Sequence, residues 1–130
     1  METKKEKKRF SVVVRIRSAN YAWRGLGILI KTTHNFWAQI FLALVAIYLG
    51  FALNISTTEW LFIIFSIGLV LVSETLNTAF EIDIDLTSPN YHPYARDTKD
   101  VAAAAVLLSC ILGAIVGMII FIPKILILLV

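Results

Sequence analysis

The stretch WLFIIFSIGLVLVSETLNTAF, at positions 60–80, decides the fold, because it contains a single charged residue, Glu74. A helix needs about 20 predominantly apolar residues to cross a hydrocarbon core about 30 Å thick. A segment inside a bilayer must also satisfy its own backbone hydrogen bonds, which a helix does and an isolated strand does not. The sequence therefore predicts a transmembrane helix at these positions.

Two further apolar stretches of similar length flank this one, FWAQIFLALVAIYLGFAL at 36–53 and a third at 101–121. The chain of 130 residues is 58% hydrophobic and 16% charged, whereas globular domains average about 45–50% apolar and about 25% charged residues. So small a core cannot hide that much apolar surface from water. We expect one integral-membrane domain, 1–130, of the all-α class with three transmembrane helices.

The positive charge is concentrated at the start of the chain, where nine of the twelve Lys and Arg residues lie within the first thirty-one positions. Residues 1–9 form a basic tail, and about 10–31 mix Val, Ile, Tyr and Trp with Arg and Lys, which is typical of a helix lying along a membrane surface. Basic residues beside apolar segments favour an anionic membrane over nucleic acid as the partner. No signal-peptide pattern is present.

The distribution of basic residues also predicts the orientation. The connection at 54–59 has no Lys or Arg, whereas the connection at about 83–99 carries Arg96 and Lys99. The positive-inside rule then places the amino terminus and the second connection in the cytoplasm, and the carboxyl terminus outside the cell membrane. Pro123 is expected to interrupt the last helix, with the tail 125–130 continuing along the outer surface.

One polar stripe runs along the helix expected at 60–80. A carboxylate at the centre of a membrane helix costs at least about 2.5–3.5 kcal/mol on insertion scales, so Glu74 needs an explanation. A helix–helix contact held by hydrogen bonds between polar side chains would explain the Asn and Thr residues of this helix. Two carboxylates seven residues apart instead favour a functional site. At 3.6 residues per turn the stripe shares one face; its members are Glu74, Asn77, Thr78, Glu81 and Asp85.

The next helix is expected to begin at Lys99 and Asp100, which would bring a positively charged side chain to the same region. Taken alone, this pair has an ordinary explanation, because Asp favours a helix start and Lys reaches to the interface. Together with the stripe it favours phosphoryl transfer, since carboxylates hold a divalent cation and a lysine meets phosphate. A non-catalytic scaffold and a proton-coupled transporter that titrates Glu74 remain as alternatives.

Other classes of site are disfavoured by the sequence. There is no Gly-rich GxxxxGK loop, and His34 and His92 have no zinc-ligand spacing. Cys110 is the one cysteine, which rules out a disulfide within the chain, and it is interpreted as a small packing residue.

The motifs resemble those of the small prokaryotic diacylglycerol kinases, a family that includes the undecaprenol kinases of Gram-positive bacteria. The resemblance spans about 15–122. The YHP segment and the NF pair are more similar to the undecaprenol-using branch. The matching motifs are ETLNTAFE (74–81), YHP (91–93), KDVAAAAVL (99–107), YAWRGL (21–26) and NF (35–36).

The resemblance implies a homotrimer that transfers phosphate from ATP, with Mg²⁺, to a membrane lipid alcohol, either undecaprenol or diacylglycerol. It implies that Glu74 is the general base and that Asn77 and Ala103 help to bind the lipid. Glu81 is implied as the metal ligand. The implied nucleotide-binding residues are Tyr21, Glu81, Asn90, Tyr91, His92, Lys99 and Asp100.

One position departs from the family pattern. Three residues before the phenylalanine of the NF pair the family has a metal-binding glutamate, and this chain has Thr33. A threonine hydroxyl is a weak, neutral ligand, although Mg²⁺ is often held by only one or two carboxylates and waters. Asp83, Asp85, His34 or waters are candidate substitutes. The sequence leaves open an active kinase with a reduced metal site or a degenerate copy.

Overall fold

The computed structural model describes residues 11–129, so the expected basic tail at 1–9 lies outside the described residues. The described chain consists of helices and contains no strand. They are α1 (Val12–Thr32), α2 (His34–Ala52), α3 (Thr57–Thr87) and α4 (Pro93–Leu129). Helices α2, α3 and α4 are each long and apolar enough to cross a membrane. The expected class, all-α with an amino-terminal helix and three membrane helices, is therefore confirmed.

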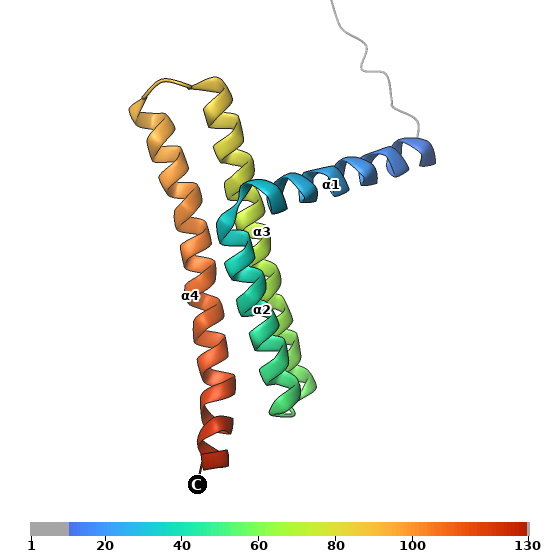
Figure 1. Ribbon diagram of the computed structural model, residues 1–130, viewed down its shortest axis with the longest axis vertical. Helices are drawn as coiled ribbons and strands as arrows, with labels where there is room; N and C mark the ends of the chain where they lie inside the picture. Colours follow the sequence, from blue (N-terminus) through green and yellow to red (C-terminus); the bar gives the residue numbers. More distant parts are fainter. Residues whose placement is uncertain (1–10, 130) are drawn as a thin grey trace, which may run out of the picture.

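Helix α1 leaves the bundle sideways, while α2, α3 and α4 run side by side (Figure 1). The chain turns between α1 and α2 at Thr33, whose backbone is extended with φ −113° and ψ 107°. The Trp37 indole Nε1 donates to the Ile30 carbonyl at 3.1 Å and ties the two helices together at this corner. Most apolar side chains of α1 are exposed, Trp23 at 72% among them, as a helix lying on a membrane surface requires.

The turn between α2 and α3 is closed by local side-chain chemistry. Asn54 has a positive φ of 46°, which Asn tolerates better than most residues. Ser56 caps α3 by accepting from the Glu59 backbone N–H, and the Glu59 carboxylate accepts from the Ser56 N–H at 2.6 Å. This capping box satisfies two backbone donors that the helix start would otherwise leave unpaired.

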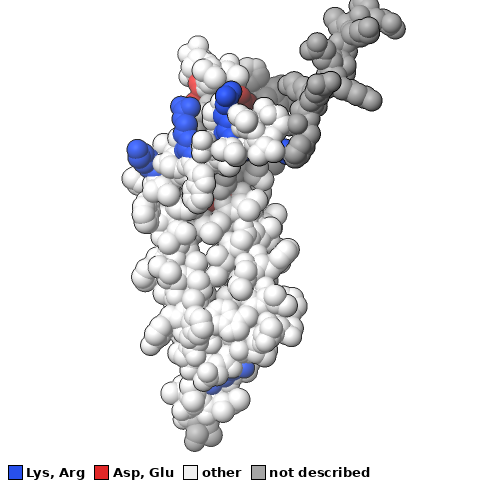
Figure 2. Space-filling view, turned by 90° about the vertical axis from the view of Figure 1, so that its right-hand side faces the viewer, with Lys and Arg blue, Asp and Glu red and all other residues white. Residues whose placement is uncertain are grey.

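Helices α3 and α4 form the most extensive interface between elements. Ser73 and Ser109 share a hydrogen bond of 2.7 Å across it. A small hydrophobic core near the turn between α2 and α3 joins three helices, with Ile55, Ile63, Ile120 and Phe121 at its centre. Charged side chains gather at the opposite end of the molecule, beyond a band that is almost free of charge (Figure 2).

Both helices of the second hairpin are longer than expected. The connection between α3 and α4 spans only 88–92, so the loop expected at 83–99 is wrong, as is the expectation that Lys99 opens the last helix. Charge does not end a helix that has emerged into water, because its backbone bonds remain satisfied within the helix. Pro93 starts α4 in the first helical position, where its missing N–H costs nothing.

The expected interruption at Pro123 is also wrong, because α4 continues through Pro123 to Leu129. Membrane helices tolerate proline when neighbouring groups and small backbone adjustments satisfy the freed carbonyl. The continuous helix places Lys124 opposite Glu59 of α3, with Nζ 3.3 Å from Oε2. The residues after Pro123, as far as Leu129, therefore extend the last helix and do not form a separate surface segment.

Candidate functional site

Glu74 is the most deeply buried large side chain among the described residues, with 1% of its surface exposed. It lies on α3, where the apolar run 60–73 precedes it. Its Oε2 accepts a hydrogen bond of 2.7 Å from the Gln39 amide Nε2 of α2. A carboxylate held this way is removed from water yet supported by a neutral donor, which is unusual for a purely structural residue.

The polar residues that follow Glu74 on α3 point to the same side of the helix. Asn77 is 7% exposed and Thr78 is 6% exposed. Asn77 Nδ2 donates to Glu81 Oε1 at 2.9 Å. The hydroxyls of Thr78 and Thr33 share a hydrogen bond of 3.1 Å. The polar stripe thus runs from a fully buried carboxylate to the half-buried Glu81.

Two buried oxygen atoms near the stripe have no hydrogen-bond partner within residues 11–129. They are Gln39 Oε1 and Asn77 Oδ1. A buried acceptor without a donor is uncommon in native structures and calls for an explanation such as an absent ligand. Asn77 Oδ1 and the Glu81 carboxylate are hard oxygen donors, the kind that a small divalent cation prefers. These residues therefore fit such a cation, although residues 11–129 contain no group of three His, Cys, Asp or Glu that could hold one.

The end of the molecule that holds the connection 88–92 carries a basic residue close to the stripe. Lys99 Nζ on α4 bonds Asp85 Oδ1 at the end of α3. Arg96 Nε lies 3.6 Å from Asp100 Oδ2 within α4. Asp85 and Lys99 are thus brought together from two helices, next to the connection that carries Asn90, Tyr91 and His92, all exposed.

The remaining expected site residues are not drawn into this cluster. Tyr21 on α1 is 64% exposed, and within residues 11–129 no hydrogen bond links its hydroxyl to the stripe. Ala103 is exposed on α4. The described chain therefore places Glu74 and Glu81 on one stripe, while Tyr21, Asn90, Tyr91 and His92, which are expected to bind nucleotide, are exposed.

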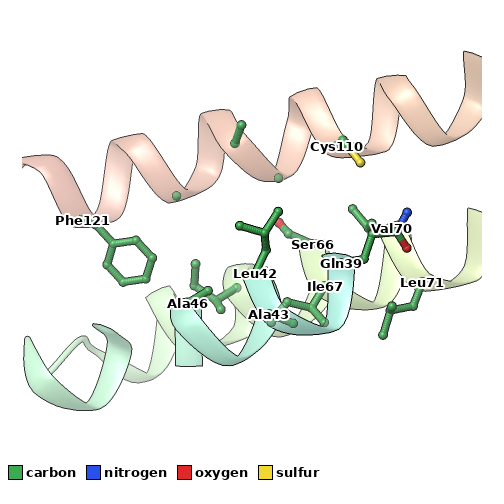
Figure 3. Close-up of a pocket in the computed structure, with 14 residues that line it drawn as sticks. Gln39, Leu42, Ala43, Ala46, Ser66, Ile67, Val70, Leu71, Cys110 and Phe121 are labelled. Carbon is green, nitrogen blue, oxygen red and sulfur yellow. The ribbon is translucent and has the colours of Figure 1, made fainter. Parts of the chain in front are cut away.

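Gln39 is the residue that sequence reasoning missed. It is the single carboxamide in the apolar stretch 36–53, and a lone polar side chain at membrane depth carries the same signal that drew attention to Glu74. It also lines an apolar cavity of about 290 Å³ between α2, α3 and α4. Figure 3 shows Gln39, Val70 and Cys110 toward one end of this cavity and Phe121 at the other.

The fold and the site together define a class: a small helical membrane protein with a buried carboxylate below a charged surface. Residues 20–121 of this chain match the family model of the prokaryotic diacylglycerol kinases. The chain belongs to this family and is a lipid kinase. Membership implies ATP as the phosphate donor, a lipid as the acceptor and a divalent metal ion.

Named relatives agree with this assignment. The undecaprenol kinase of Bacillus subtilis (strain 168) is 36% identical over 108 residues, which cover 83% of this chain and 88% of that protein. The diacylglycerol kinase of Synechocystis is 36% identical over 110 residues, covering 84% of this chain and 63% of that protein. The diacylglycerol kinase of Escherichia coli (strain K12) is 30% identical over 100 residues, covering 77% and 82%.

Proposed function

We propose that this chain transfers the γ-phosphoryl group of ATP to the hydroxyl of a membrane lipid alcohol, with Mg²⁺, at the cytoplasmic face of the cell membrane. The observation that carries the proposal is the buried Glu74 carboxylate, 1% exposed on a polar stripe that leads to the charged end of the molecule. A lipid hydroxyl is confined to the membrane interface, so its base must lie at membrane depth. The phosphate donor is water-soluble and must arrive from the charged end.

In this proposal Glu74 is the general base. It takes the proton from the lipid hydroxyl as that oxygen forms a bond to the γ-phosphorus and the bond to the bridging oxygen of ADP breaks. Asn77 and Ala103 help to place the lipid. Burial keeps competing water away from the carboxylate, which favours transfer to the alcohol over hydrolysis.

The nucleotide is proposed to lie at the charged end. Lys99 meets its phosphates, which requires the lysine to exchange its contact with Asp85 for one with phosphate. Glu81 would hold Mg²⁺, which when bound neutralises negative charge on the phosphates. Asn77 holds one oxygen of Glu81 through the 2.9 Å hydrogen bond. The other proposed nucleotide-binding residues are Tyr21, Asn90, Tyr91, His92 and Asp100.

The lipid is proposed to be undecaprenol or diacylglycerol. The Bacillus subtilis relative is named for the first and the other two relatives for the second. Both are long apolar molecules with one free hydroxyl, and the site described here requires no more than that. Measuring phosphorylation of both lipids side by side distinguishes them.

The active protein is proposed to be a homotrimer. The residues expected at the nucleotide site are spread over an open surface within one chain, and side chains of a neighbouring copy would enclose them. The mass of the purified protein–detergent complex tests this proposal. A complex that contains a single chain and is fully active would contradict it.

The central test is ATP-dependent phosphorylation of the two lipids in mixed micelles. We expect Glu74→Gln to lower turnover by about 10²–10⁴-fold, the usual contribution of a general base. Glu59→Gln is the matched control, because Glu59 is a carboxylate of the same helix that lies at the opposite end, away from the stripe. Full activity of Glu74→Gln, or an equal loss in both variants, would contradict the assignment of the base.

A further inference from the structure

Gln39 occupies a costly position. Its carboxamide lies within the membrane-spanning part of α2, which is otherwise almost entirely apolar. Placing an amide in such surroundings is unfavourable unless its groups are hydrogen-bonded. One half of the amide is bonded, because Nε2 donates to Glu74 Oε2 at 2.7 Å. The other half is not, because Oε1 is buried without a partner among residues 11–129.

The orientation of this amide follows from the chemistry of its partner. An ionised carboxylate has no proton to donate, so it can bond only the NH₂ group of a carboxamide. The bond from Gln39 Nε2 to Glu74 Oε2 is compatible with the ionised carboxylate that the proposed base requires before transfer. When Glu74 has become a carboxylic acid, its O–H needs an acceptor, and the Oε1 of the same amide is that acceptor.

We propose that Gln39 is a positioning residue that supports Glu74 in both of its protonation states, an inference that rests on the proposed function. Before transfer, Nε2 donates to the carboxylate and holds it in place. As the lipid oxygen bonds to phosphorus and ADP leaves, the hydroxyl proton passes to Glu74. A half turn of the Gln39 amide then lets Oε1 accept that proton in a hydrogen bond until Glu74 releases it.

The surroundings allow this rotation. The terminal torsion of a glutamine side chain is broad and roughly two-fold, so the two amide orientations differ little in intrinsic energy. Gln39 also lines the cavity between α2, α3 and α4 (Figure 3). A lysine at this position could support only the ionised carboxylate, and an apolar side chain could support neither form.

The test compares Gln39→Met, which removes both the donor and the acceptor at similar size, with Leu42→Met as the matched control. Leu42 lies on the same helix and lines the same cavity, and no hydrogen bond joins it to Glu74. We expect Gln39→Met to lower kcat for lipid phosphorylation by about 10–100-fold, as a misplaced catalytic group does. The KM for ATP should not change, and Leu42→Met should retain the wild-type kcat.

A second variant separates positioning from packing. Gln39→His restores one N–H donor and one acceptor on a neutral ring, so it should recover most of the kcat that Gln39→Met loses. A kcat for Gln39→Met within twofold of wild type would overturn the inference, as would a similar loss in Leu42→Met or no recovery in Gln39→His. A wild-type protein that phosphorylates neither lipid would instead overturn the proposed function.

Discussion

Thr33 stands where the family resemblance implies a metal-binding glutamate, and the structure places it beside the stripe. It ends α1, and its hydroxyl bonds that of Thr78, which lies one helical turn before Glu81 on α3. A longer carboxylate side chain at this position would therefore lie near the proposed cation site. This supports treating Thr33 as the neutral counterpart of a metal ligand.

Replacing Thr33 with glutamate should strengthen the metal site. A second carboxylate adds a charged oxygen ligand in a partly dehydrated place, where charges are screened less than in water. We expect Thr33→Glu to lower the Mg²⁺ concentration needed for half-maximal kinase rate. Thr32→Glu is the control, because Thr32 is exposed and its hydroxyl donates to the Ile28 carbonyl of its own helix.

The direction in which Thr33→Glu changes the Mg²⁺ response and the stability distinguishes a working metal site from a degenerate one. If no cation binds there, the added charge lies near Glu81 without a partner, and repulsion should destabilise the protein in a way that Mg²⁺ does not relieve. That result would support a chain with a degenerate metal site. An unchanged Mg²⁺ response together with unchanged thermal stability would show that Thr33 does not face the cation.

At the scale of elements, the hairpin of α2 and α3 depends on a close approach at Gly50. A Cβ built on Gly50 would lie 2.6 Å and 2.8 Å from two ring carbons of Trp60, and 3.1 Å from the Ile55 Cδ1. The Trp60 ring is itself packed against Phe51, with ring centroids 4.8 Å apart. The turn therefore closes only because glycine leaves room for the indole.

We expect Gly50→Ala to destabilise the protein by about 1–3 kcal/mol, the usual cost of overpacking. Gly68→Ala is the matched control, since a Cβ at Gly68 in the middle of α3 meets nothing within 4 Å. It should be neutral or stabilise the helix by about 0.5–1 kcal/mol. Thermal unfolding of the two variants in the same detergent measures the difference, and equal midpoints would contradict the packing argument.

At the scale of the whole molecule, charge is segregated along the long axis. Most charged side chains in view lie at the end where α1 joins the bundle, and a small basic patch lies near the other end (Figure 2). Lys124 of α4 is paired with Glu59 near the start of α3, at the end of α3 away from the connection 88–92. We therefore propose that the end carrying α1 and the connection 88–92 faces the cytoplasm, in keeping with the positive-inside rule.

Labelling of single cysteines in intact cells tests this orientation. In a Cys110→Ala background, Thr58→Cys should react with a membrane-impermeant maleimide from outside, because Thr58 is exposed at the start of α3. Asp97→Cys, exposed at the start of α4, should react only after the cells are permeabilised. The reverse pattern would place the proposed nucleotide site outside the cell and would contradict the proposed function.

The sequence by itself determined the membrane helices, the amino-terminal helix and the stripe from Glu74 to Asp85. These features depend on hydropathy and on the helical period, both of which are properties of neighbouring residues along the chain. The loop expected at 83–99 and the break expected at Pro123 were wrong for a related reason. Charge and proline are local signals, and neither ends a helix whose remaining backbone hydrogen bonds are satisfied.

Only the tertiary structure decided which distant side chains meet. Gln39 and Glu74 are 35 residues apart and belong to different helices, and Asp85 and Lys99 meet across a connection that was expected to be a long loop. Such pairs depend on how each helix is rotated about its axis and on how closely it approaches its neighbour, which packing determines and periodicity does not. The partner of the buried Glu74 carboxylate was therefore visible only once α2 and α3 were packed together.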